Sequence, residues 1–305
     1  MRVTRALAVA CVANGAWVDP PGWRDAPNRD RAAEFLARLR HDAYDDYVTE
    51  LGWPNATTRQ GHRVRGWTNI GGIRGALEPL VQGELGSAEI TVIEVGAWIG
   101  GSANAIADRL KQAPALQKAK LHVVSVDTWL GAPEFWGECC INAPDRGGGL
   151  RRVRGYPTVF HTFTRNLWLR GHGDVSSPLP LSGLEAATVL RDWDVRADAI
   201  YVDAAHDTEA AYRDMVTYWP LLRPGGVMFG DDAANARVFQ AIVNFQSSFA
   251  SQIKRRYDTS GPLRPRKSVW TLQKSDAVPA WPLSKPPPRR KAGGKLSKLG
   301  GGRIR

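Results

Sequence analysis

Short apolar runs rich in β-branched residues alternate with stretches of helical periodicity from about residue 89 to residue 274. Each apolar run has the length of a buried strand, and each periodic stretch would bury one face of a helix. This alternation predicts a doubly wound α/β fold with a mostly parallel sheet and right-handed crossovers. We expect strands at 91–95, 121–126, 175–181, 199–202, 227–230 and 268–273, and helices at 31–53 (capped by Asn28 or Asp30), 73–81, 102–111, 182–192, 208–222 and 236–249.

The chain outside this region divides by composition. A proline-rich loop ends near residue 27, and residues with helical spacing follow it. The first 18 residues place two arginines before an apolar stretch, which fits a short signal or transit peptide; without one, a cytoplasmic location is favoured. We expect a targeting or disordered N-terminal segment (1–27), a helical cap (28–88), an α/β domain (89–274) and a basic, disordered tail (275–305).

The excess positive charge lies mostly in the tail. Of the net charge of +11, eight charges come from basic residues after residue 284, where no acidic residue occurs. The α/β domain is therefore only mildly basic, and its charge does not indicate a nucleic-acid surface. The three cysteines provide no disulfide framework, and no apolar run of roughly 18 residues predicts a membrane span.

The first strand of the α/β domain runs directly into a glycine-rich turn, EVGAWIGGS, at 94–102. Its glycines lack the G-x-G-x-x-G spacing that lets a pyrophosphate approach the backbone. The wider E-x-G-x-x-x-G spacing suits a ligand with an amino-acid end, whose ammonium group can meet Glu94 while its carboxylate meets backbone N–H groups. The alternative is an ordinary turn after a buried strand.

Acidic residues stand at the carboxyl ends of three further strands. Asp127 ends the second strand, where a carboxylate can accept hydrogen bonds from both ribose hydroxyls of a nucleoside. Asp203 ends the fourth strand, with His206 one turn beyond, and Asp231 and Asp232 end the fifth. Carboxylates this close repel each other unless a cation lies among them, and oxygen ligands suit Mg²⁺. The alternative for these acids is helix capping or contact with solvent.

Five motifs in order give the chain a family resemblance. They are EVGAWIGGSA, VVSVDTWLGAPEFW, F-x-x-N at 163–166, YVDAAHDTEAAYRD and WPLLRPGGVMFGDD. Together they resemble the class I S-adenosylmethionine-dependent methyltransferases, and within them the small-molecule O-methyltransferases of macrocin and caffeoyl-CoA type. The resemblance covers about residues 66–274 and implies a seven-stranded Rossmann-like methyltransferase sheet. An AAH in place of the usual ASH or ADK, and a longer loop at 136–156, depart from the pattern.

The same resemblance implies roles for individual residues. In the metal-dependent members, acids at the positions of Asp203, Asp231 and Asp232 hold the ion, for which we expect Mg²⁺. His206 stands at the position of a basic catalytic residue, and Asp203 is expected to serve catalysis with it. The residues expected to bind S-adenosylmethionine are Glu94, Gly96, Ala97, Gly100, Ser102, Asp127, Thr128, Ser182 and Asp203.

The resulting prediction is methyl transfer from S-adenosylmethionine to a hydroxyl of a small molecule. A sulfonium methyl is already activated, so the enzyme must align the acceptor oxygen and remove its proton, for which a divalent ion and His206 are suited. Trp129, Phe135 and Trp136 either line the acceptor pocket or anchor their loop to the core. An RNA or protein acceptor, a non-catalytic cofactor-binding role and a homo-oligomer stay open, although the paired acids Asp231 and Asp232 disfavour a polyanion.

Overall fold

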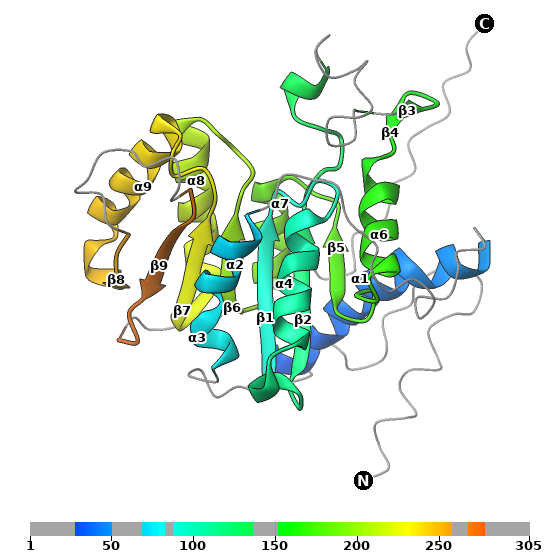
Figure 1. Ribbon diagram of the computed structural model, residues 1–305, viewed down its shortest axis with the longest axis horizontal. Helices are drawn as coiled ribbons and strands as arrows, with labels where there is room; N and C mark the ends of the chain where they lie inside the picture. The colour runs from blue at the N-terminus through cyan, green and yellow to red at the C-terminus, as the bar shows by residue number, and fades with distance from the viewer. Residues whose placement is uncertain are drawn as a thin grey trace, which may run out of the picture.

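One central sheet organises the chain (Figure 1). The computed structural model describes residues 28–50, 69–82, 88–136, 150, 152–257 and 268–277. The predicted targeting segment, the basic tail after residue 277 and all three cysteines lie outside these residues.

The sheet contains seven of the described strands. They are β1 (Glu89–Val95), β2 (Lys120–Val126), β5 (Ser176–Leu179), β6 (Ala197–Val202), β7 (Leu222–Gly230), β8 (Ile253–Arg255) and β9 (Trp270–Lys274). Their order across the sheet is β5-β2-β1-β6-β7-β9-β8. Every neighbouring pair from β5 to β7 is parallel, whereas β9 is antiparallel to both β7 and β8. The predicted doubly wound, mostly parallel seven-stranded sheet is therefore confirmed.

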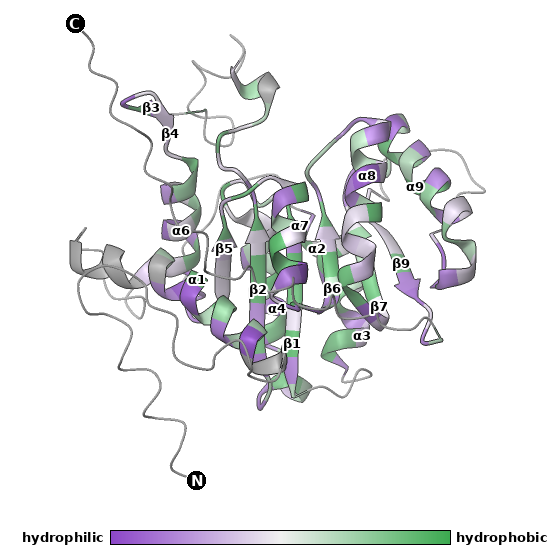
Figure 2. Cartoon of the chain, turned by 180° about the vertical axis from the view of Figure 1, so that it is seen from behind, coloured by the Kyte–Doolittle hydropathy of each residue, from purple (hydrophilic) through white to green (hydrophobic). Residues whose placement is uncertain are grey.

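Helices cover both faces of the sheet (Figure 1). One face carries α2 (Ile70–Ala76), α3 (Glu78–Val81) and α4 (Gly101–Lys111). The other face carries α1 (Asn28–Glu50), α7 (Gly183–Asp192), α8 (Thr208–Tyr218) and α9 (Ala236–Ser248). Beside β5, α6 (Val159–Leu169) contacts α1 and α4. Figure 2 shows both hydrophilic and hydrophobic residues on α8 and α9, as expected for helices with one face on a core.

The N-terminal helices belong to these two layers. In α1, Tyr44 donates a hydrogen bond to Ser176 Oγ at 2.9 Å, and the backbone carbonyl of Leu36 accepts one from Ser177 Oγ at 3.0 Å. Both serines lie on the edge strand β5, so α1 is fixed to the sheet by side chains as well as by apolar packing.

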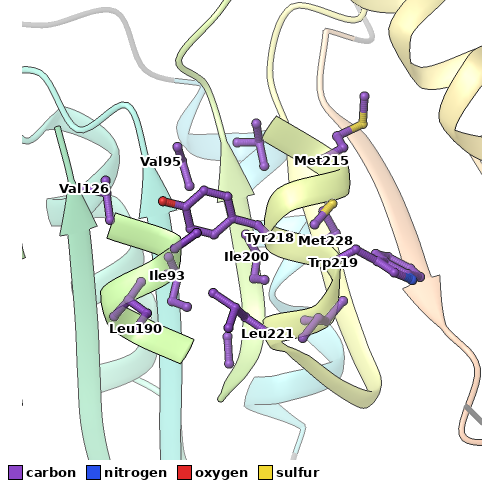
Figure 3. Close-up of a cluster of buried hydrophobic side chains, with 14 of the residues drawn as sticks. Ile93, Val95, Val126, Leu190, Ile200, Met215, Tyr218, Trp219, Leu221 and Met228 are labelled. Carbon is purple, nitrogen blue, oxygen red and sulfur yellow. The ribbon is translucent and has the colours of Figure 1, made fainter. Parts of the chain in front are cut away.

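Alternate residues of the central strands enter two different cores, because successive side chains of a strand point to opposite faces. Ile93 and Val95 of β1 lie in the same buried cluster as Ile200 of β6 and Tyr218 of α8 (Figure 3). Val92, one residue away on β1, instead joins the cluster under α2, α3 and α4. Both faces of the central strands are therefore buried under helices, which explains the nearly continuous apolar runs in the sequence.

Several element boundaries differ from the predicted ones. The helix expected at 208–222 ends at Tyr218 and continues as a 3₁₀ turn (Trp219–Leu221), because Pro220 has no N–H for the helical ladder. The helix expected at 73–81 is two short helices, α2 and α3, with Pro79 in the first turn of the second. The sequence did not predict α6, the hairpin of β3 (Arg152–Val153) and β4 (Tyr156–Pro157), or the three-residue β8.

None of the helices in the described ranges has both the length and the apolar character needed to cross a lipid bilayer.

Gly230 ends β7 at a point where a side chain does not fit. A Cβ added there would lie 2.2 Å from the carbonyl oxygen of Val202 and 2.6 Å from the Trp270 ring. We expect Gly230→Ala to lower the free energy of unfolding by about 1–3 kcal/mol, because the backbone of β6 cannot move aside without disturbing the sheet. Urea denaturation measures this change.

Gly75→Ala is the control for that substitution. A Cβ added at this helical position meets no described atom within 4 Å, so the variant should be as stable as the wild type or more stable by up to about 1 kcal/mol. Equal stability of the two variants would contradict the tight approach of β6, β7 and β9.

Candidate active site

The carboxyl ends of β1, β2, β6 and β7 meet at one edge of the sheet, because these strands are parallel. The chain runs from β1 through β2 to β5 on one side and returns to β6 and β7 on the other, so the strand order reverses between β1 and β6. Ligands of open α/β sheets bind outside the carboxyl ends of the strands at such a point. All the predicted site residues lie at this edge or in the segments that leave it.

The turn after β1 requires glycine at two positions. Gly96 has a φ of +92° and Gly100 a φ of +85°, both in the left-handed region. A Cβ added at Gly96 would lie 2.1 Å from the carbonyl oxygen of Asp203, and one at Gly100 would lie 2.5 Å from Leu167 Cδ2. Gly96 therefore allows the ends of β1 and β6 to close together, and Gly100 allows α6 to pack on the start of α4. The carbonyl of the buried Ala97 accepts the Gly100 N–H at 2.9 Å.

Asp127 connects this turn to the loop after β2. Its Oδ2 accepts the N–H of Trp98 at 2.8 Å, and its Oδ1 accepts the N–H of Trp129 at 2.7 Å. The indole Nε1 of Trp129 also donates to the Trp98 carbonyl at 2.7 Å. Both tryptophans have positive φ angles, 45° and 52°, so these bonds stabilise two unfavourable backbone conformations. Burial raises the pKa of Asp127, while hydrogen bonds from backbone N–H groups oppose the rise.

Glu94, next to the end of β1, has no exposed surface. Ser125 Oγ donates to its Oε2 at 2.7 Å, and its buried Oε1 has no hydrogen-bond partner among the residues that the structure describes. Burial raises the pKa of Glu94 to about 7, with further contributions from the negative charges of Asp203 and Asp127, while the nearby serine hydroxyls lower it. Its expected contact with a ligand ammonium group stays a prediction.

The other predicted cofactor residues occupy helix starts and loops. Ser102 is buried in the first turn of α4, and Ser182 is the residue that precedes the first turn of α7. Thr128 is exposed, and its hydroxyl accepts the N–H of Leu130 at 3.2 Å. The structure thus distributes these three side chains along the edge where β1, β2 and β5 end.

A group of three ionisable side chains forms where β6 and β7 end. His206 Nε2 lies 2.9 Å from Asp232 Oδ2 and 3.8 Å from Asp203 Oδ1. One atom from each of the three residues fits within 4.8 Å, a spacing at which they could hold a metal ion. Asp203 and Asp232 raise the pKa of His206 to about 10, and His206 lowers the pKa of Asp232. Only the contact with Asp232 has the length of a hydrogen bond.

Asp231 is not a member of this group. Its Oδ1 accepts the backbone N–H of Asp232 at 2.8 Å, and its carbonyl accepts the Trp270 indole at 3.1 Å. Consecutive side chains point in different directions, which explains why only one of the paired acids meets Asp203. The sequence predicted a metal site of Asp203, Asp231 and Asp232. Within the described residues, the three side chains that lie close enough together are Asp203, His206 and Asp232.

The comparison with known families identifies this region. Residues 93–233, just under half of the chain, match the family model described as a methyltransferase domain. Residues 93–233 are a methyltransferase domain. The family predicted from the five motifs is thereby confirmed, and every predicted site residue lies in the matched range. No curated protein matches the chain.

Several solved structures resemble this methyltransferase at low sequence identity. An O-methyltransferase from Bacillus cereus in complex with SAH is 13% identical, with coverage of 82% of this chain and 92% of that one and a TM-score of 0.43. The O-methyltransferase NovP is 16% identical, with coverage of 80% and 99% and a TM-score of 0.47. TomG from Streptomyces achromogenes is 15% identical, with coverage of 79% and 89% and a TM-score of 0.42. The fold assignment of this methyltransferase rests on its own strand order.

Two residues that support the methyltransferase site were not predicted as site residues. Tyr201 Oη donates to Asp203 Oδ2 at 2.9 Å, and Asn166 Nδ2 donates to the Ile99 carbonyl at 2.8 Å. Burial is the main cause of the raised pKa of Tyr201. Asn166 belongs to the F-x-x-N motif, and Tyr201 of β6 stands two residues before Asp203, which directly follows the strand; in an extended chain this spacing places both side chains on the same face.

The aromatic residues after β2 serve different purposes. Trp129 is 2% exposed in a cluster with α6, which favours the loop-anchor interpretation over a pocket lining. Phe135 stacks on Trp98 with a ring-centroid distance of 4.6 Å, and Trp136 is exposed. The loop after β2 is therefore attached to the glycine-rich turn of the methyltransferase by ring stacking as well as by Asp127.

Glu94 should make the stability of the methyltransferase depend on pH. Because its pKa is raised from 4.5 to about 7 in the folded protein, the folded state holds an extra proton between these values, and stability falls as pH rises through them. Glu94→Gln mimics the protonated form, so the variant should lose this dependence and be more stable than the wild type at pH 8 by up to about 3 kcal/mol.

Urea denaturation between pH 5 and pH 8 measures this difference. Glu185→Gln, at an exposed position of α7, is the control and should keep the wild-type pH dependence. Identical pH dependence of the wild type and Glu94→Gln would show that Glu94 is already ionised at pH 5.

Proposed function

We propose that this protein transfers a methyl group from S-adenosylmethionine to a hydroxyl of a small molecule, with the help of a divalent metal ion. The observation that carries the proposal is the contact between the glycine-rich turn after β1 and the residues that follow β6. Gly96, in the turn expected to hold the methyl donor, touches the backbone of Asp203, and Asp203 stands beside His206. A donor held by the turn therefore lies next to groups that can activate a hydroxyl.

The turn after β1 and the start of α4 fit the amino-acid end of the donor. Backbone N–H groups at a helix N-terminus attract a carboxylate, and Gly100 in its left-handed conformation leads the turn directly into the first turn of α4. Asp127 fits the ribose end, because it lies at the end of β2 beside the glycine-rich turn and each carboxylate oxygen can accept more than one hydrogen bond. Ser182 lies where the adenine edge is expected.

Asp203 and Asp232 fit a divalent ion. Their carboxylate oxygens suit Mg²⁺, which prefers oxygen over nitrogen ligands. When bound, the ion supplies Lewis-acid activation by lowering the pKa of the acceptor hydroxyl. His206 Nε2 faces both carboxylates and is half-exposed, and without an ion these carboxylates keep it protonated, with its pKa raised to about 10. A cation bound by Asp203 and Asp232 would oppose that positive charge and lower the pKa, so that the neutral imidazole could take the hydroxyl proton as a general base.

The charge of this edge supports a small acceptor over a nucleic acid. Asp231 and Asp232 lie in the loop that leaves β7, and Asp203 leaves the neighbouring β6. Three carboxylates at one edge repel a phosphate backbone. A neutral or cationic hydroxylated molecule meets no such repulsion.

Binding of the methyl donor tests the core of the proposal. Isothermal titration calorimetry with S-adenosylmethionine should show binding by the wild type and roughly tenfold or greater weakening in Asp127→Asn, because a charge-assisted acceptor for the ribose is lost. Asp276→Asn, in an exposed ion pair with Lys254, is the control and should bind like the wild type. Absence of binding by the wild type would refute the proposed activity.

Three variants separate the roles of the residues in the acidic group, which consists of Asp203, His206 and Asp232. Mn²⁺ binding followed by electron paramagnetic resonance should be lost in Asp203→Asn and kept in His206→Gln. Turnover, measured as S-adenosylhomocysteine release with a library of phenols and sugars, should fall by about 10²–10⁴-fold in His206→Gln. Asp231→Asn should keep Mn²⁺ binding, because Asp231 is outside the group.

Two results would contradict these expectations, one from chelation with EDTA and one from Asp231→Asn. Wild-type turnover that survives EDTA would remove the ion from the mechanism. If the Asp231→Asn variant lost Mn²⁺ binding, Asp231 would be a metal ligand, as the sequence predicts. Neither outcome would affect the proposed binding of S-adenosylmethionine.

A further inference from the structure

A buried phenol touches the acidic group from inside the protein. Tyr201 lies in β6 and has no exposed surface. Its hydroxyl donates to Asp203 Oδ2 at 2.9 Å, whereas the other carboxylate oxygen, Oδ1, is the atom nearest to His206. The two oxygens of Asp203 are therefore distinguished: one is held from within by Tyr201, and the other faces the site.

The ring of Tyr201 is itself held by the sheet. It lies 5.1 Å from the ring of Phe229, measured between centroids, and the two residues are paired across β6 and β7. Glu94 is the paired residue on the other side, in β1. A side chain enclosed by both neighbouring strands cannot change position easily, so the direction of its O–H is well defined.

We infer that Tyr201 is a positioning residue that fixes the Asp203 carboxylate in the orientation needed to bind a divalent cation. This inference rests on the proposed metal-assisted function. A free carboxylate would have to lose rotational freedom on binding the ion, whereas a carboxylate already held through Oδ2 presents Oδ1 without that cost. Hydrogen bonds of this kind to metal-binding side chains commonly change metal affinity 10- to 100-fold.

A purely structural role makes a different prediction. If Tyr201 only fills space beside Phe229, Tyr201→Phe keeps the ring and should leave metal binding unchanged. If Tyr201 positions Asp203, the same variant removes the hydroxyl proton that Oδ2 accepts and should weaken metal binding while the fold persists.

Tyr218 offers a matched control. It is also fully buried, and its hydroxyl also donates to one oxygen, the Gly183 carbonyl, at 2.8 Å. That carbonyl opens α7 and is not part of the acidic group. Tyr218→Phe therefore reproduces the loss of one buried hydroxyl without changing a contact of Asp203.

The experiment compares the wild type, Tyr201→Phe and Tyr218→Phe in the full chain. Mn²⁺ affinity is measured by electron paramagnetic resonance, S-adenosylmethionine affinity by calorimetry, and folding by circular dichroism and thermal melting. We expect Tyr201→Phe to weaken Mn²⁺ binding by about 10- to 100-fold. We expect Tyr218→Phe to bind Mn²⁺ within twofold of the wild type, and both variants to keep the wild-type circular dichroism spectrum.

The outcomes separate this inference from the proposed function. Wild-type Mn²⁺ affinity in Tyr201→Phe would overturn the positioning role while leaving the metal site in place. Equal weakening in both tyrosine variants would also overturn it, because the effect would then follow from the loss of any buried hydroxyl. Absence of Mn²⁺ binding by the wild type would instead refute the metal-assisted function.

Discussion

The close approach of β1 and β6 is the constraint on which the rest of this site depends. The N–H of Asp203 donates to the carbonyl of Val95 at 2.9 Å, and Gly96 packs its Cα against the Asp203 carbonyl where no Cβ would fit. This contact brings the glycine-rich turn to the start of the acidic group. In the proposed function, this contact is what would bring the methyl donor next to the groups that activate the acceptor.

Each carboxylate at this edge is stabilised in a different way. Glu94 is buried, with its pKa raised to about 7 and one hydrogen bond from Ser125. Asp127 keeps its oxygens on backbone N–H groups of two loops. Asp232 pairs with the cationic form of His206. The site therefore concentrates negative charge without leaving all of it unpaired, and the part nearest to solvent is the part suited to bind a cation.

Much of the fold was predictable from the sequence, and the misses have local causes. The expected strand at 91–95 and helix at 236–249 agree closely with β1 and α9, because the first is an apolar run that ends at a glycine and the second has a clear helical period. By contrast, β8 has only three residues, too few for a period, and α6 follows a long connection from which it is not separated by a clear signal. Pro220 moved the boundary of α8 because a proline in the last turn breaks the hydrogen-bond ladder.

By itself, the sequence determined the class of fold, the methyltransferase family and the strand ends at which the glycine-rich turn and the acidic residues lie. Strand length, helical period and glycine spacing are local properties of the chain, so they can be read without coordinates. Only the tertiary structure decided that His206, and not Asp231, joins Asp232, and that Tyr201 holds Asp203 from within. The direction of a side chain at a strand end depends on backbone angles and on neighbouring strands that are distant in the sequence, which no local pattern specifies.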